Sequence, residues 1–220
     1  MTDQSPSTVA TPTGPTAESA PPAAITREFV RGRVRRIQEG YLRHPKSSWS
    51  RASLAQLRRG VGREVGSVPE ILELTINPDA ARVWSDAPTP DEIAIHTAMT
   101  LYAVHQQSLS RPMHVPRVPF GSALGAIRYV DGRESAGVVR RFQAMGTASS
   151  VEELVHHART LITLLRRAEC GFDYGLFAED IAAFQNPRRA DLVRLRWGRD
   201  FYRIAAPTPT PSTTATEEPS

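Results

Sequence analysis

Residues 150–167 read SVEELVHHARTLITLLRR, and this stretch indicates the fold class of the chain. Apolar residues recur in it at intervals of three and four positions, the spacing of one face of an α-helix. They are Leu154, Ala158, Leu161 and Leu165. Ser150 and Glu153 have the spacing of a capping box, which begins a helix, and Gly171 has the position of a glycine that ends one. The stretch therefore predicts an amphipathic helix with one side in a core.

Helical patterns continue toward the N-terminus. The motif TPDE at residues 89–92 combines a capping box with a proline and two acids in the first turn, and it predicts a helix to about Gln107. Ser50 is expected to cap a short helix that stops near Gly60, and Asn77-Pro78 to begin another. One more apolar stripe predicts a helix through Val30, Val34, Ile37 and Tyr41.

The C-terminal part begins after a proline-rich connection at residues 108–120. Helices are expected over 120–129 and 134–145, and Asp173 is expected to cap a further helix that ends before Asn186-Pro187. The segment VRLRWGRDFY (residues 193–202) alternates as a strand does. We favour a helix there because the chain offers no partner strand. The prediction is an all-α bundle of eight or nine helices, with halves at about 25–110 and 118–205.

Composition places the chain among ordinary globular proteins. It has 220 residues, of which 40% are apolar and 23% charged. Segments 1–24 and 206–220 consist largely of Pro, Ser, Thr and Ala, and they are predicted to be disordered tails. A single cysteine, Cys170, excludes a disulfide-stapled domain. Because the chain shows neither a signal sequence nor a membrane-spanning apolar run, we expect a cytoplasmic protein that contacts no membrane.

Patterns that carry catalysis or bind metal are missing from the sequence. It contains no HExxH, GxSxG or cysteine pair, and glycines 60, 62 and 66 do not have nucleotide-loop spacing. Cys170 follows a predicted helix C-terminus, which raises a thiol pKa rather than lowering it. We therefore predict no catalytic residue, no metal ligand and no cofactor. The chain is not expected to be an enzyme.

Arginine dominates the basic residues. Segment 25–204 holds all 27 basic residues and 19 of the 23 acids, so its formal charge is +8, and Lys46 is the only lysine. Guanidinium groups suit bidentate binding of phosphate, although a single doublet is equally typical of a solvated helix face. Their number predicts one basic ridge that contacts nucleic-acid backbones with little base readout. The predicted binding residues are Arg58, Arg59, Arg140, Arg141, Arg188, Arg189, Arg194, Arg196 and Arg199.

Seven segments in one order resemble the CasB family, the small subunit of the type I-E CRISPR surveillance complex, Cascade. The resemblance spans about residues 27–204, nearly the whole predicted folded part. The segments are LAQLRRG (54–60), TLYAVHQQS (100–108), FGSALG (120–125), RRF (140–142), HARTLITLLRR (157–167), DY (173–174) and VRLRWGRDFY (193–202).

The resemblance implies an all-helical, non-enzymatic subunit in antiviral defence. In that family two copies pack along a crRNA-guided assembly, contact its repeated backbone subunit and its large subunit, and help hold the crRNA–target DNA heteroduplex and the displaced strand. Arg58-Arg59 fall at the family's basic doublet after the second helix, and Arg140 at a basic position before a Phe-Gln pair. Arg188-Arg189 fall at its basic turn before the last helix.

Two other classes of function compete with this interpretation. A stand-alone helical DNA-binding regulator would need a recognition helix, which the sequence does not reveal, and its binding would depend on DNA sequence. A helical metalloenzyme could use two carboxylate–histidine pairs at helical spacing, although capping boxes already account for both glutamates. The pairs are Glu92 with His96 and Glu153 with His156.

Overall fold

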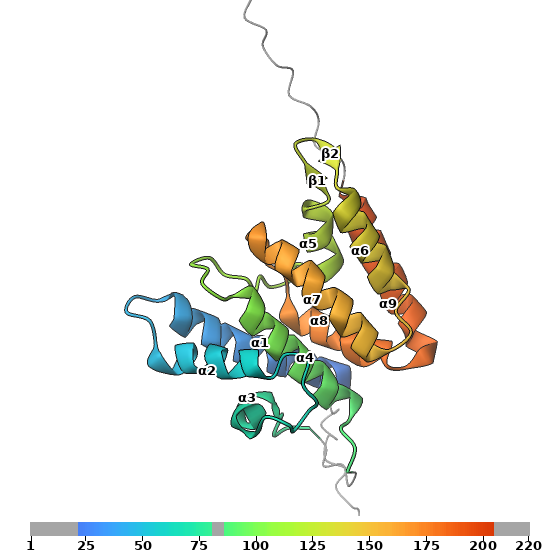
Figure 1. Ribbon diagram of the computed structural model, residues 1–220. Helices are drawn as coiled ribbons and strands as arrows, with labels where there is room; N and C mark the ends of the chain where they lie inside the picture. Colours follow the sequence, from blue (N-terminus) through green and yellow to red (C-terminus); the bar gives the residue numbers. More distant parts are fainter. Residues whose placement is uncertain (1–21, 81–85, 205–220) are drawn as a thin grey trace, which may run out of the picture.

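Helices form almost all the regular structure of the computed structural model, which describes residues 22–80 and 86–204 (Figure 1). In chain order they are α1 (Pro22–Leu42), α2 (Ser48–Arg59), the 3-10 turn η1 (Pro69–Ile71), α3 (Leu72–Thr75), α4 (Pro90–His105), α5 (Phe120–Ala126), α6 (Ala136–Gly146), α7 (Val151–Arg167), α8 (Tyr174–Phe184) and α9 (Pro187–Arg203). The one sheet of the described ranges is an antiparallel hairpin of β1 (Tyr129–Val130) and β2 (Arg133–Glu134). The all-α prediction is confirmed.

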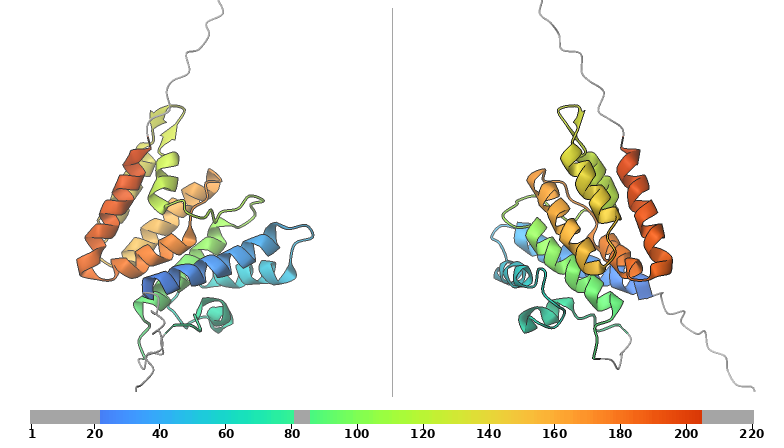
Figure 2. Two further views of the ribbon diagram at one scale, coloured as in Figure 1. Left: turned by 180° about the vertical axis from the view of Figure 1, so that it is seen from behind. Right: turned by 45° about the vertical axis from the view of Figure 1, so that its right-hand side comes forward.

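Helix α8 occupies the centre of the packing. It lies against α1 and α4 on one side and against α9 on the other, while α5 runs along α9 and α6 along α7 (Figures 1 and 2). A single hydrophobic cluster reaches from Val34 of α1 through Met99 of α4 to Phe177 of α8 and Trp197 of α9. Both predicted halves contribute to this cluster, and the division into halves stays a prediction.

Capping residues begin the helices much as their sequences predict. At α4, Thr89 Oγ1 accepts a hydrogen bond from the Glu92 amide (3.2 Å), and the Glu92 carboxylate accepts one from the Thr89 amide (2.7 Å). At α7, Ser150 Oγ accepts from the Glu153 amide (3.2 Å). The Glu153 carboxylate, however, accepts from the Ser149 amide (2.8 Å), so the second half of the predicted box is displaced by one residue.

Two predicted helix starts are wrong. Ser47 caps α2, and Ser50 lies inside the helix, buried where Gly40 lets α1 approach α2. A Cβ on Gly40 would overlap the Ser50 Oγ and lie 3.1 Å from the Ser47 Cβ, so the close approach favours glycine. Asn77-Pro78 forms a turn in which Asn77 Oδ1 accepts from the Asp79 amide (3.1 Å), and no helix begins there in the described part of the chain.

Glu169, not Gly171, terminates α7. Glu169 has a left-handed φ of 51°, and the Cys170 amide donates to the Leu165 carbonyl (2.9 Å), which is the pattern of a Schellman cap. Gly171 serves packing instead. A Cβ there would lie 2.9 Å from the Pro112 carbonyl oxygen, so glycine allows the two backbone segments to approach each other.

The hairpin lies between α5 and α6, where the sequence predicts the end of one helix and the start of the next. Asp131 and Gly132 have φ values of 49° and 74°, and this two-residue loop reverses the chain. Helix α5 therefore ends at Ala126 and α6 begins at Ala136. The helix predicted over 193–202 is confirmed, and α9 continues through Gly198 to Arg203.

Helix α1 begins at Pro22, so the last three residues of the predicted N-terminal tail are helical. The rest of that tail and all of segment 206–220 lie outside the described residues. Among the helices of the described ranges, none combines the length and the apolar character needed to cross a bilayer.

Candidate nucleic-acid interface

Arg58 and Arg59 form the last turn of α2. Cations are favourable at this position because the unpaired carbonyls of a helix C-terminus carry partial negative charge. Arg58 is half-buried and Arg59 is exposed, and neither makes an ion pair with an acid of the described residues. Both guanidinium groups can therefore take an external anion.

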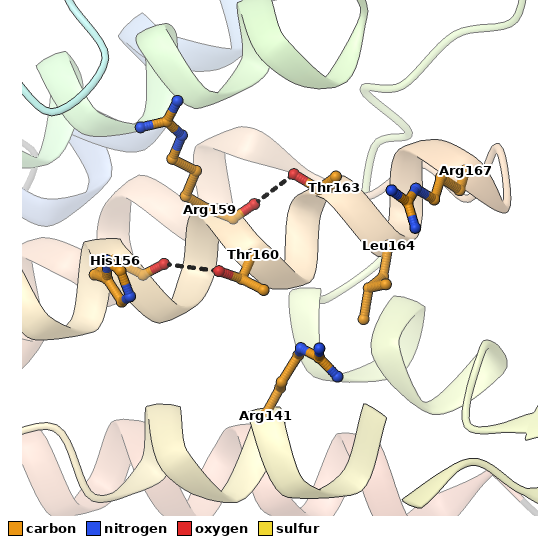
Figure 3. Close-up of a pocket in the computed structure, with 7 residues that line it drawn as sticks. All are labelled: Arg141, His156, Arg159, Thr160, Thr163, Leu164 and Arg167. Carbon is orange, nitrogen blue, oxygen red and sulfur yellow. Dashed lines mark hydrogen bonds between the residues drawn. The ribbon is translucent and has the colours of Figure 1, made fainter. Parts of the chain in front are cut away.

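A groove of about 380 Å³ runs between α6 and α7, and its lining is basic (Figure 3). Arg141 extends from α6 toward α7, which supplies the remaining lining residues. These are His156, Arg159, Thr160, Thr163, Leu164 and Arg167. No carboxylate of the described residues lines the groove, so three guanidinium groups share it without a counter-charge.

The two threonine hydroxyls of this groove donate hydrogen bonds within α7 rather than to the groove. Thr160 Oγ1 donates to the His156 carbonyl (3.3 Å) and Thr163 Oγ1 to the Arg159 carbonyl (3.0 Å), both within α7. Arg141 donates to the Gly137 carbonyl one turn back in α6 (3.0 Å) and keeps its other N–H groups for a ligand. The groove thus presents fork-shaped donors of the kind that bind phosphate oxygens.

Arg159, Arg167 and His156 are site residues that the sequence analysis missed. His156, Arg159, Thr163 and Arg167 recur at intervals of three and four, so helical spacing already places them on one face of α7. That face is opposite the apolar stripe and resembles any solvated face. Only the packing of α6 alongside it makes a groove.

Arg188 and Arg189 stand in the first turn of α9, after Pro187. Cations are unfavourable there because the helix N-terminus carries partial positive charge, and no acid lies in that turn to compensate. Both side chains are exposed, and neither pairs with an acid of the described residues. Two arginines placed against the helix dipole in this way are typical of a functional surface. Arg140 of α6 and Arg199 of α9 are likewise exposed and without an acidic partner.

Arg194 is engaged within the fold. Its guanidinium donates to the carbonyls of Gly146 (2.9 Å) and Ala148 (2.7 Å) and to Asp191 (2.8 Å). It also lies 4.8 Å from the centroid of the Phe184 ring. These contacts tie α9 to the turn between α6 and α7.

Arg196 pairs with Asp180 of α8, and the same carboxylate accepts from the Trp197 indole (2.5 Å). Burial raises the pKa of Asp180 to about 6, and the charge and hydrogen bond of Arg196 oppose that rise. Arg196 therefore compensates a buried carboxylate in this structure. We expect the two engaged arginines, Arg194 and Arg196, to serve the fold more than a ligand.

The nine predicted arginines do not form the single ridge that the sequence suggested. Arg58 and Arg59 lie on α2, which packs against α1 and α4 at the lower left of Figure 1, whereas α6 and α9 lie at the right. Helices α6 and α9 adjoin, because Phe142 stacks on Phe201 with 4.0 Å between ring centroids. The structure thus has a basic α2 end, a basic α6–α7 groove and a basic outer face of α9.

The four residues of the metalloenzyme alternative have separate roles. His96 is buried with Nε2 3.1 Å from the Gly60 carbonyl oxygen, and burial lowers its pKa. Glu92 and Glu153 serve the caps of α4 and α7, while His156 lines the groove. Within the described residues no three His, Cys, Asp or Glu side chains gather as a metal site. Cys170 is not one of these four residues. Burial raises the pKa of its thiol, which disfavours the nucleophilic thiolate.

A family model for the CRISPR-associated protein Cse2 matches residues 53–202. The chain belongs to the Cse2 family. CasB from Thermobifida fusca, a solved structure, shares 33% sequence identity with it at a TM-score of 0.70, over 81% of this chain and 98% of that one. The resemblance to CasB drawn from the sequence is therefore confirmed.

More distant structures share the Cse2 fold. CasB from Thermus thermophilus is 22% identical at a TM-score of 0.58, over 83% of this chain and 98% of that one. A chain of a structure described as a CRISPR RNA-guided surveillance complex is 20% identical at 0.57, over 81% and 94%. These two show the fold alone. No curated protein matches the chain significantly.

Proposed function

We propose that this chain is a non-catalytic, nucleic-acid-binding subunit of a crRNA-guided type I-E surveillance complex, Cascade, that acts in antiviral defence. Membership of the Cse2 family supports the complex, as does the likeness to a chain of an RNA-guided surveillance complex. The proposed partners are crRNA, target DNA, the repeated backbone subunit, the large subunit and a second copy of this chain. A cytoplasmic location without membrane contact belongs to the same proposal.

The groove between α6 and α7 is the observation that carries the nucleic-acid part of this proposal. Three arginines line it with no carboxylate among its described lining residues. A phosphate backbone is the ligand that best fits such a surface, because each neutralised phosphate releases condensed counterions. Half-buried Arg58 and exposed Arg59 at the end of α2 offer a second contact of the same chemistry.

Backbone contacts alone suffice for this role. In RNA-guided recognition the guide reads the target by base pairing, and the protein recognises the shape and charge of the strands. Exchange of a DNA duplex for an RNA–DNA heteroduplex is nearly balanced in free energy, so a few arginine–phosphate contacts shift it. We therefore assign the basic surfaces to the heteroduplex and the displaced strand.

The test is co-expression of this chain with the other subunits of its host's complex and crRNA. We expect the chain to co-purify in fixed stoichiometry, and a complex assembled without it to release target DNA at lower salt. A chain that stays outside the complex would refute the proposal. So would binding by the isolated chain that survives competition with excess unrelated DNA, since that is the behaviour of a sequence-specific regulator.

A further inference from the structure

The outer face of α9 carries an exposed apolar patch, of which the fold engages Tyr202 through edge-to-face contacts with the rings of Phe142 and Phe201. Five large apolar side chains are exposed among the described residues, and three of them lie on this helix. They are Leu192 (60% exposed), Leu195 (49%) and Tyr202 (53%), and their spacing places them on the side opposite the buried Trp197. Single exposed apolar residues are ordinary, but three on one helix face form a patch. We call these three residues the α9 apolar face.

Gly198 lies beside this face, three residues after Leu195 and four before Tyr202. A glycine inside a helix is destabilising relative to alanine, so it needs a reason. The described residues supply none, because a Cβ at Gly198 would meet none of their atoms within 4 Å outside the adjoining turns of α9. Gly121 and Gly125 of α5, by contrast, are hemmed in by α9. Gly198 therefore allows close approach from outside.

Unpaired arginines border the α9 apolar face. Arg188 and Arg189 precede it and Arg199 lies within its span, all exposed and without an acidic partner in the described ranges. The acids of the same helix are already paired: Asp191 with Arg194 (2.8 Å) and Asp200 with Arg203 (3.9 Å). Arg199 therefore adds positive charge inside the face, and Arg188 and Arg189 add it at the N-terminal edge.

We propose that the α9 apolar face docks against another protein chain whose contact surface combines apolar side chains with carboxylates. The proposal rests on the proposed function, because the partner is another subunit of the same complex. Leu192, Leu195 and Tyr202 contact the partner's apolar side chains, and Gly198 lets its backbone come close. Arg199 within the face and Arg188 and Arg189 at its N-terminal edge pair with its carboxylates.

Other occupants fit this face less well. Pairing of two α9 faces would bring the unpaired arginines of both copies together, which like-charge repulsion opposes. Segment 205–220 carries Glu217 and Glu218 but no large apolar residue to cover the leucines. Nucleic acid would satisfy the arginines and leave Leu192 and Leu195 against a polar backbone.

Two substitutions test the proposal in the full chain, co-expressed with the other subunits and crRNA. Leu195→Glu replaces an apolar contact of the face with a carboxylate that repels the carboxylates of the partner, and Gly198→Gln places a side chain in the path of the partner. We expect each to lower the amount of chain in the purified complex about tenfold or more relative to wild type. Gly198→Gln should keep or raise the melting temperature of the free chain, because glutamine favours helix over glycine. Val130→Glu, at an exposed apolar residue of the hairpin, is the matched control and should incorporate normally.

The outcomes separate this proposal from the function on which it rests. Wild-type chain that fails to join the complex would overturn both. Normal incorporation of wild type and both variants would overturn the docking proposal alone. Variants that incorporate but retain less target DNA would assign the face to nucleic acid. A wild-type dimer that Leu195→Glu dissociates would assign it to a second copy, and faster proteinase K cleavage after Ile204 in both variants would assign it to segment 205–220.

Discussion

Arg31 donates a hydrogen bond from Nη2 to Oδ2 of Asp173 over 2.7 Å, and the pair joins α1 to the start of α8 across 142 residues of chain. Asp173 is fully buried, and it also accepts from the amides of Arg117 (2.8 Å) and Gly175 (2.9 Å). Burial alone would raise the pKa of Asp173. The hydrogen bonds from Arg31 and the backbone outweigh burial and hold its pKa below the ordinary value.

Asp173→Ala is therefore expected to destabilise the chain strongly. The substitution removes the cap of α8, the Arg117 contact and the partner of Arg31 together, and loss of one member of a buried ion pair costs about 3–5 kcal/mol. Urea unfolding measures the change. Asp191→Ala, at an exposed acid of α9, is the control and should change the free energy of unfolding by less than about 0.5 kcal/mol. Equal effects of the two would mean that Asp173 does not hold α1 to α8.

Acid is expected to destabilise the fold through its buried histidines. Burial lowers the pKa of His105 to about 3, and it also lowers the pKa values of His96 and His114. Below about pH 6.5 the unfolded chain binds a proton at His105 that the folded chain does not bind until about pH 3, and the pKa values of His96 and His114 are shifted in the same direction. The free energy of unfolding therefore falls as pH falls from about 6.5, with His105 alone contributing about 2 kcal/mol by pH 5.

Asp180 acts in the opposite direction. Its folded pKa of about 6 lies above the unfolded value, so between about pH 6 and 4 the folded chain binds a proton that the unfolded chain does not. The pKa shift of His105 is larger than that of Asp180, and His96 and His114 are shifted in the same direction as His105. The free energy of unfolding should therefore still rise with pH between pH 5 and 7. Urea unfolding at pH 7 and 5 gives this slope, and His105→Gln should reduce it by about one proton. An unchanged slope would show that His105 is protonated in the fold.

Alanine substitutions at two glycines should change the free energy of unfolding in opposite directions. A Cβ on Gly121 of α5 would lie 2.5 Å from the Trp197 carbonyl oxygen and 2.9 Å from the Asp200 Cβ, so Gly121→Ala must push α5 from α9. We expect it to lower the free energy of unfolding by about 1–3 kcal/mol. The methyl group of Gly198→Ala would meet no described atom within 4 Å beyond the adjoining turns of α9, so this substitution should raise that free energy by about 0.5–1 kcal/mol. Thermal melts compare the two, and a stabilising Gly121→Ala would contradict the packing of α5 on α9.

Features that depend on neighbours in sequence could be predicted, and features that depend on neighbours in space could not. The Thr89–Glu92 box and the apolar stripe of α7 involve residues within one or two turns, and the structure has both. The pairing of Arg31 with Asp173 spans almost the whole fold. Asp131-Gly132 is a local hairpin signal that the helical context obscured.

The candidate site divides in the same way. Sequence identifies which residues are arginines, but only packing distinguishes an engaged guanidinium from an available one. Arg194 and Arg199 lie five positions apart on α9, yet the first bonds three acceptors and the second none of the described residues. The α6–α7 groove likewise needs two helices that the sequence does not place side by side.

Arg194→Ala should affect stability and leave nucleic-acid binding intact. The substitution removes the bonds to the Gly146 and Ala148 carbonyls, which are part-buried, and each lost bond costs about 1 kcal/mol or somewhat more. Arg199→Ala, at an exposed arginine, serves as the control for stability and should change it by less than about 0.5 kcal/mol. Loss of DNA binding by folded Arg194→Ala, with a flatter salt dependence, would place Arg194 at the nucleic acid instead.

Phosphate contacts at the α6–α7 groove and at the α2 end should both make nucleic-acid affinity depend on salt concentration. Each arginine that contacts a phosphate of a single strand adds about 0.7 to the slope of log affinity against log salt concentration. Arg141→Ala with Arg167→Ala should therefore lower that slope by about 1.4, and Arg58→Ala with Arg59→Ala by a similar amount. Filter binding over a salt series measures both slopes.

Sequence dependence distinguishes these contacts from base readout. Because phosphates are the same in every strand, both double variants should weaken binding equally for unrelated sequences. The control pair, Arg35→Ala with Arg133→Ala, removes two exposed arginines outside both groups and should leave the slope unchanged. An equal drop in the slope for the control pair would mean that the effect comes from net charge and not from contacts at the two sites. A loss of binding confined to one sequence would mean that these arginines read bases. The chain would then be a stand-alone DNA-binding regulator and not a subunit of an RNA-guided complex.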